Sequence, residues 1–169
     1  MVSKHPHIRP MTPKDKPAIM QILQATPEFT TGEVVVAEEL IDSYLDDPIS
    51  SGYLTFVAEV NSRVVGYICI GPTPLTEGTW DIYWIAVSRE EQIRGIGTAL
   101  LTYAENKIRE SRGRLAFIET SSRTEYDRTR SFYHSRGYEL VCQMADFYAP
   151  GDDKLILLKR LSPQGNLQS

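Results

Sequence analysis

The stretch "WDIYWIAVSREEQIRGIGTALL", residues 80–101, joins a predicted strand to a predicted helix. Residues 80–87 are aromatic, β-branched or apolar apart from Asp81, which predicts a strand buried on both faces. Apolar residues at 100, 101, 104 and 108 have helical spacing, which predicts a helix over about residues 97–111. The run between them is therefore a strand-to-helix turn, and it contains Gly95 and Gly97.

Strand and helix signals continue on both sides of this turn. Thr12 and Asp15 form a predicted N-cap, and Asn61–Arg63 is a predicted hairpin turn. The expected elements are a strand near residue 8, helices over about 12–27 and 32–47, a hairpin over 53–71, a strand over 114–122, a short helix over 125–137, and closing strands over 139–148 and 153–161. This order predicts an α/β or α+β domain with a mixed sheet.

Length and composition limit the class of protein. With 169 residues, 41% of them hydrophobic, residues 1–169 are expected to form a single domain, with 163–169 as a frayed tail. A net charge of −4 without a basic cluster argues against a nucleic-acid partner and suits an amine substrate. No apolar run reaches the ~20 residues that span a bilayer, so we expect a cytoplasmic protein with no membrane partner. Three scattered histidines predict no metal site.

The glycine turn precedes a helix N-terminus, where unpaired N–H groups and a partial positive charge favour a phosphate. Glycine would let the backbone approach such an anion closely. Leu100 stands where a dinucleotide fingerprint needs its third glycine, and no Gly-Lys-Ser/Thr of a P-loop follows. From these residues alone, a phosphate-binding turn and a merely tight turn both remain open.

A second motif accompanies the turn. Gln92, Gly95 and Gly97 form Q-x-x-G-x-G, and "FYHSRGY" follows at residues 132–138. Together they resemble the GNAT superfamily of acetyl-CoA-dependent N-acetyltransferases. The resemblance implies a mostly antiparallel sheet of about six to seven strands with a central parallel pair, flanked by about four helices. It also implies transfer of an acetyl group from acetyl-CoA to a primary amine. A non-catalytic acyl-CoA-binding regulatory module is the alternative.

The resemblance also implies how the cofactor is bound. Members of the superfamily hold the pyrophosphate on the backbone of the turn and the pantetheine arm against the preceding strand. Tyr126 and Thr129 replace the asparagine and alanine of many members and are expected to line the cofactor channel. The implied cofactor-binding residues are Ile85, Ala86, Val87, Gln92, Ile93, Arg94, Gly95, Ile96, Gly97, Thr98, Tyr126 and Thr129.

Acyl transfer to an amine requires a base for the ammonium and a proton donor for the thiolate. The resemblance assigns the donor role to Tyr133, although packing beside Phe132 is an alternative. Asp81 and Glu119 both match positions where branches of the superfamily carry a base. A carboxylate inside an apolar strand has a raised pKa, which suits that role.

Several assignments stay open at this stage. Asp81 could instead be exposed at an edge, Glu119 could be paired with Arg123 or Arg130, and water alone could take the proton. Arg130 itself could contact a cofactor phosphate or be solvated. The substrate could be a small amine, an amino acid or a peptide. Asp146, Asp152 and Asp153 could bind its cation or only solvate a turn, and oligomeric state, including a homodimer, is not determined.

Overall fold

The computed structural model describes residues 5–161, without the side chains of Ile93 and Arg94. The predicted tail at 163–169 lies outside the described residues. The chain forms two compact units, one made of residues up to Gly71 together with Tyr83–Asn106, the other of Pro72–Ile82 together with the residues from Lys107 onward. Strand β4 contributes its second half to the first unit and its first half to the second.

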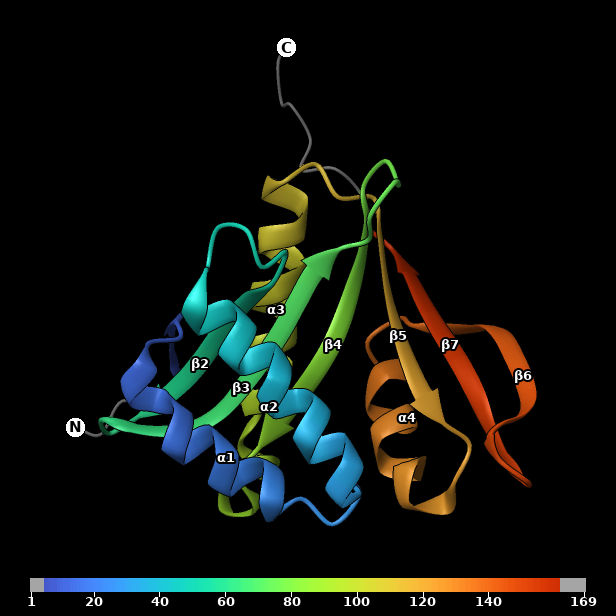
Figure 1. Cartoon of the computed structure of the whole chain (residues 1–169), viewed down its shortest axis with the longest axis horizontal. Helices are drawn as coiled ribbons and strands as arrows, with labels where there is room; N and C mark the ends of the chain where they lie inside the picture. The colour runs from blue at the N-terminus through green and yellow to red at the C-terminus, as the bar shows by residue number, and fades with distance from the viewer. Residues whose placement is uncertain (1–4, 162–169) are drawn as a thin grey trace. The chain divides into compact units, whose positions relative to one another are not determined.

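The elements follow the predicted order (Figure 1). The strands are β1 (His7–Pro10), β2 (Leu54–Val60), β3 (Arg63–Pro72), β4 (Thr79–Val87), β5 (Leu115–Ser121), β6 (Glu139–Ala149) and β7 (Asp152–Arg160). The α-helices are α1 (Lys16–Gln24), α2 (Thr31–Asp46), α3 (Ile96–Glu110) and α4 (Asp127–His134). Short 3₁₀ helices occupy η1 (Pro13–Asp15), η2 (Arg89–Arg94) and η3 (Thr124–Tyr126).

The strands hydrogen-bond in the order β1-β2-β3-β4-β5-β7-β6. β4 and β5 are parallel, whereas the register pairs β1–β2, β2–β3, β5–β7 and β6–β7 are antiparallel. Within residues 5–161, four α-helices and a seven-stranded sheet with a parallel β4–β5 pair confirm the predicted fold class.

In the first unit, helices cover both faces of β2 and β3. Val57, Tyr67 and Cys69 alternate onto one face and are buried with apolar residues of α1 and α2. Gly66 and Phe56 lie on the other face, where the Phe56 ring contacts Tyr103 of α3. A Cβ on Gly66 would lie 3.1 Å from Leu100 Cδ1, so glycine allows α3 to approach. Figure 1 shows α1 and α2 crossing these strands.

Two predicted element boundaries, the turn between β2 and β3 and the start of η1, are explained by backbone conformation and hydrogen bonds of nearby residues. Asn61 and Ser62 both have positive φ, at 50° and 61°, as a two-residue hairpin turn requires. At the start of η1, the Asp15 carboxylate accepts hydrogen bonds from the backbone N–H and the hydroxyl of Thr12. The same carboxylate receives two bonds from Arg9, which also binds Glu59 and so ties the N-terminal strand to the hairpin.

In the second unit, β7 lies between β5 and β6. Ala116, Ile118, Leu155 and Leu157 are buried on one face of β5 and β7. Lys159 shares that face, and its ammonium lies 5.5 Å from the ring centroid of Tyr138, whose ring contacts Tyr133 of α4. Helix α4 therefore packs on this face, beside β5 in Figure 1.

Candidate active site

Asp81 lies on β4 where the parallel ladder ends. The β4–β5 register pairs Thr79 with Leu115, Trp80 with Ala116 and, last, Asp81 with Phe117. The expected burial of β4 on both faces is wrong in part. Trp80, Ile82 and Ala86 are buried, whereas the alternate positions, Asp81 among them, are only half-buried. Asp81 thus occupies the less covered face at the end of a ladder.

Glu119 shares a sheet face with Asp81. Phe117 is the partner of Asp81, and Glu119 is two residues farther along β5, so strand alternation places both carboxylates on one side. The Glu119 Oε2 atom lies 2.5 Å from Lys154 Nζ of β7. The side chain of Glu119 is 39% exposed, so the expectation of a carboxylate buried in an apolar strand is wrong for Glu119. Its cationic partner is Lys154, not Arg123 or Arg130.

The environment of Asp81 raises the pKa of its carboxyl to about 7. Burial is the largest cause because it disfavours the charged form. The negative charge of Glu119 raises the pKa further, whereas the ammonium of Lys154 lowers it. Asp81 therefore exchanges its proton near neutral pH, as a general base for an amine should.

The raised pKa of Asp81 also predicts how stability depends on pH. The pKa rises from 3.8 to about 7 on folding, so its contribution to stability is fully present below pH 3.8 and is lost as pH rises through 7. Above pH 7, this loss is at most about 4 kcal/mol, since one pKa unit is worth about 1.4 kcal/mol. Asp81→Asn should therefore gain stability relative to the parent protein between pH 4 and pH 8, as measured by urea unfolding. A stability difference that is the same at both pH values would contradict the assigned environment of Asp81.

Tyr133 belongs to the layer of α4. Its ring makes edge contacts with Phe132 and Tyr138, at centroid distances of 5.2 and 5.6 Å. Burial raises the pKa of its hydroxyl, so the phenol keeps its proton at neutral pH. Packing beside Phe132 is thus confirmed, and the neutral phenol also has the form that a proton donor needs. The donor role itself stays a prediction.

The surroundings of Tyr126, Thr129 and Arg130, which precede Tyr133 in η3 and α4, agree only in part with the sequence predictions. Tyr126 is buried, and the Arg123 guanidinium lies 5.2 Å from its ring centroid, while Thr129 is half-buried. Arg130 donates to the carbonyl oxygens of Ser121 and Arg123, at 2.5 and 3.0 Å, and pairs with Asp127. Arg130 therefore joins the end of β5 to α4, and of the two alternatives left open for it, a solvated surface arginine is wrong.

The turn after β4 contains a structure that the sequence did not predict. Residues Arg89–Arg94 form η2, and α3 begins at Ile96, one residue earlier than expected. Gly95 joins the two helices in the left-handed conformation, with φ of 76°. No described atom outside its chain neighbours lies within 4 Å of a Cβ built on Gly95, so space is open beside the backbone. The predicted contacts of the Ile93 and Arg94 side chains lie outside the described residues.

The end of β4 is held by one main-chain and one side-chain hydrogen bond. Ser88 N–H donates to the Val65 carbonyl at 2.7 Å, and the Gln92 side chain donates to the Val87 carbonyl at 3.4 Å. Ala86 is buried, while Ile85 and Val87 are half-buried. The predicted pantetheine residues are thus ordinary strand residues, and their role stays a prediction.

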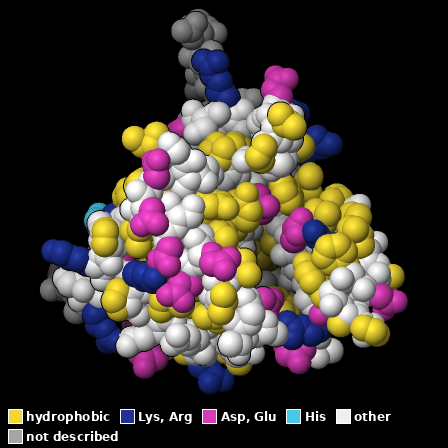
Figure 2. All heavy atoms as spheres, in the orientation of Figure 1, with side chains coloured by type: hydrophobic (Ala, Val, Ile, Leu, Met, Phe, Trp, Pro, Cys, Tyr) yellow, Lys and Arg dark blue, Asp and Glu magenta, His cyan; other side chains and the backbone are white. Residues whose placement is uncertain are grey.

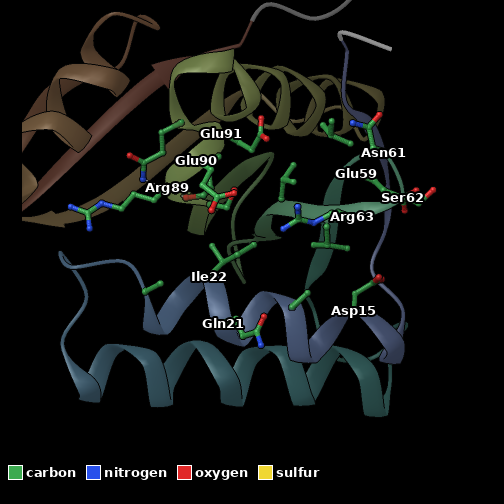
Figure 3. A pocket seen from close by; sticks show the side chains of 18 of the residues that line it. Asp15, Gln21, Ile22, Glu59, Asn61, Ser62, Arg63, Arg89, Glu90 and Glu91 are labelled. Atoms are coloured by element: carbon green, nitrogen blue, oxygen red, sulfur yellow. Dashed lines mark hydrogen bonds between the residues drawn. The ribbon is translucent and has the colours of Figure 1, made fainter. Parts of the chain in front are cut away.

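A pocket in the first unit lies next to this turn, between α1, the β2–β3 turn and the segment after β4 (Figure 3). Arg63, Arg89, Glu90 and Glu91 are among its lining residues. The sequence reasoning did not find this pocket, because its walls come from segments far apart in the chain. Side chains of both charges line it, so its charge favours no ligand class.

The aspartates of the β6–β7 connection accept hydrogen bonds from neighbouring residues. Asp153 accepts from the Gln143 side chain and from Asp146 N–H, and the Asp146 carboxylate accepts from Gly151 N–H. Asp152 accepts from the Ser121 hydroxyl at 2.5 Å. These carboxylates shape the β6–β7 connection and anchor it to the end of β5. Within residues 5–161, no three His, Cys, Asp or Glu side chains come together as candidate metal ligands.

Comparisons with known proteins identify the family. The model of the GNAT acetyltransferase domain matches residues 51–140, more than half of the chain. An uncharacterised N-acetyltransferase of Methanocaldococcus jannaschii is 33% identical over 105 residues, which cover 62% of this chain and 65% of the relative.

Solved structures of acetyltransferases are also similar to this chain. A Desulfovibrio desulfuricans protein described as a GNAT-family acetyltransferase is 38% identical, with a TM-score of 0.87, over 93% of this chain and 99% of its own. An aminoglycoside 6′-N-acetyltransferase solved with coenzyme A has the same fold at 18% identity, with a TM-score of 0.73, over 95% and 99% of the two chains. No helix among the described residues is long and apolar enough to cross a membrane. The family match and the 38% identical structure together show that this chain belongs to the GNAT acetyltransferase family.

Proposed function

We propose that residues 1–169 act as one N-acetyltransferase domain, which moves an acetyl group from acetyl-CoA to a primary amine. The observation that carries this proposal is Asp81, a half-buried carboxyl with a pKa of about 7 at the end of the β4–β5 ladder, in a chain of the GNAT family. A carboxyl that titrates near neutral pH can accept a proton from an ammonium group and release it to water.

The proposed reaction uses two protein groups. Asp81 takes one proton from the substrate ammonium, directly or through a water. The free amine then attacks the thioester carbonyl carbon, a C–N bond forms and the C–S bond breaks. Tyr133 donates its proton to the departing sulfur and regains one from the new amide nitrogen. Asp81 finally releases its proton to solvent, so one proton is released per turnover. Glu119 is an auxiliary carboxylate.

The two groups lie on opposite faces of the sheet in the second unit. Asp81 shares its face with Glu119, whereas Tyr133 packs with α4 on the other. The β4–β5 register ends at Asp81 and Phe117, and Asp81 and Tyr133 both belong to the second unit.

The turn in the first unit supports the proposed cofactor site. The fifteen-residue helix α3 begins directly after Gly95, so its first N–H groups and its dipole favour a phosphate. The space beside Gly95, where no described atom outside its chain neighbours lies within 4 Å of a built Cβ, leaves the backbone open to an approaching anion. The proposed contacts are those predicted from the sequence, with the pyrophosphate on the backbone of Gln92–Thr98 and the pantetheine arm along Ile85–Val87.

The proposed substrate is a small amine, an amino acid or a peptide amine. The α2 sequence contains Glu33, Glu38, Glu39, Asp42 and Asp46 and neither Lys nor Arg. Figure 2 shows acidic side chains gathered over the region of α1 and α2. Although Lys16 neutralises part of this charge by pairing with Glu38 and Asp42, a surplus of negative charge attracts ammonium substrates.

Acetyl-CoA binding gives the first test. At a hundredfold excess over its dissociation constant, acetyl-CoA should stabilise the protein by about 2.7 kcal/mol, measured as a rise in Tm. NAD and ATP should raise Tm far less. Gly95→Val should abolish the acetyl-CoA effect, because its side chain would fill the open space beside the turn.

Gly52→Val is the matched control for backbone strain. Gly52 also has a left-handed φ, of 77°, and open space where a Cβ would lie, but it is outside the turn. Both variants should lose similar stability, and only Gly52→Val should keep the acetyl-CoA shift. If Gly95→Val keeps the shift as well, the phosphate is bound elsewhere, and if the parent protein shows no shift, the proposed function is wrong.

A further inference from the structure

One face of the sheet in the second unit carries a row of three charged side chains. Asp81 pairs with Phe117, and Phe117 and Glu119 pair in turn with Leu158 and Ile156 of β7. Lys154 is two residues from Ile156 and therefore points to the same side. Glu119 and Lys154 are diagonal neighbours on adjacent strands, close enough for long side chains to meet.

Lys154 is held from two sides. Its ammonium lies 2.5 Å from Glu119 Oε2 and 4.6 Å from the ring centroid of Phe147 on β6. Its side chain is only 15% exposed, less than the 39% of Glu119. A lysine that pairs with a carboxylate and lies over an aromatic ring is more strongly oriented than a freely solvated one. The Lys154 ammonium is therefore a fixed charge on the face that carries Asp81.

We propose that Lys154 is a positioning residue for the base Asp81: its ammonium, held by Glu119 on the sheet face that carries Asp81, partly offsets the negative charge of Glu119 there, so that Asp81 can accept the proton of the substrate ammonium. This inference rests on the proposed function. Glu119 raises the pKa of the Asp81 carboxyl and Lys154 lowers it. Because the two side chains are paired, each charge partly offsets the effect of the other on Asp81. Neither residue needs to touch the substrate for this purpose.

The charged surroundings of Asp81 are few. Among the described residues, Glu119 on β5 and Lys154 on β7 are the charges that shift the pKa of Asp81. Farther along the same face, Asp152 is paired with Arg123. Strand β3 carries no Asp, Glu, Lys, Arg or His between Val64 and Pro72. Changes at Glu119 and Lys154 should therefore dominate the titration of Asp81.

The decisive measurement is the titration midpoint of the Asp81 carboxyl carbon, followed by NMR in the protein without substrate. Lys154→Met removes the cation and should raise this midpoint by about one pH unit, while its aliphatic chain can still cover Phe147. Glu119→Gln removes the anion and should lower the midpoint. Lys154→Arg keeps the charge and should restore the parent value.

Kinetics should follow these midpoints. For a midpoint that moves from about 7 to about 8, the ionised fraction of Asp81 at pH 7 falls about fivefold, and kcat/KM of Lys154→Met should fall with it. The loss should disappear near pH 9, because Asp81 is then ionised in both proteins. A merely structural loss would persist at every pH and would not be rescued by Lys154→Arg.

The outcomes separate this inference from the proposed function. If Lys154→Met leaves the Asp81 midpoint unchanged, or moves it in the same direction as Glu119→Gln, the role of Lys154 is wrong whether or not the protein is active. If the midpoints move as expected but no variant, nor the parent, acetylates any amine, the proposed function is wrong and Lys154 positions no catalytic base. If Lys154→Met and Glu119→Gln shift the Asp81 midpoint in opposite directions, and Lys154→Met also loses kcat/KM in a pH-dependent way, the role of Lys154 and the proposed function are both supported.

Discussion

Asp81→Asn should lower kcat/KM by about 10²- to 10³-fold at pH 7, within the usual range for loss of a general base. The variant can use only substrate that is already deprotonated, whereas the parent protein deprotonates the abundant ammonium form. Below about pH 7, where Asp81 is itself protonated, both rates should fall together and the loss should be constant. Above pH 7 the loss should shrink, because the free amine becomes common. The measurement is kcat/KM from pH 6 to pH 9.5.

Glu119→Gln provides the matched control for this experiment, because it removes the other carboxylate on the same sheet face. As an auxiliary group, Glu119 should matter less than Asp81, and its removal should only move the acidic limb of the profile to lower pH. A larger loss in Glu119→Gln than in Asp81→Asn would assign the base to Glu119. Equal losses that do not depend on pH would mean that neither carboxylate is the base.

Tyr133→Phe should lower kcat about 10²-fold while acetyl-CoA affinity stays within a few fold. The substitution removes only a hydroxyl, so the edge contacts with Phe132 and Tyr138 remain. The loss should therefore fall on proton donation to the departing thiolate. Steady-state kinetics with a saturating amine, combined with an acetyl-CoA binding isotherm, separate the two effects.

Tyr138→Phe is the control for Tyr133→Phe. Tyr138 is buried in the same aromatic cluster, and its ring contacts that of Tyr133, but the proposed reaction gives its hydroxyl no part. Its kcat should stay close to that of the parent protein. An unchanged kcat in Tyr133→Phe would reduce Tyr133 to packing, and an equal loss in both variants would indicate a change in the cluster rather than a lost proton donor.

The sequence predicted the fold well because its signals are local. Hydrophobic periodicity and the turn at Asn61 and Ser62 depend on neighbouring residues, and the structure confirms the predicted order of elements. The 3₁₀ helix η2 escaped prediction because its residues show no apolar periodicity. Its junction with α3 at Gly95 depends on a left-handed backbone conformation that glycine permits but does not require.

The sequence named candidate site residues but could not show their contacts. The half-burial of Asp81 was not predicted, because the apolar run of β4 indicated a strand buried on both faces. The exposure of Glu119 depends on what covers that face of β5, and its partner Lys154 depends on the insertion of β7 between β5 and β6. The alternating pattern of β7 could have placed Lys154 on one face of its strand. Only the register of β5 against β7 shows that this face is the one that carries Glu119.

Release of free CoA thiol from acetyl-CoA, followed with a panel of amines, decides whether the protein transfers the acetyl group to an amine. The panel should include an aminoglycoside, a polyamine, free amino acids and peptides with a free N-terminus, and mass spectrometry should identify the acetylated amine. We expect thiol release that depends on at least one amine and is strongly reduced in Asp81→Asn at pH 7. A protein that binds acetyl-CoA but releases no thiol above the amine-free rate with any of these amines would contradict it and would indicate a non-catalytic acyl-CoA-binding module.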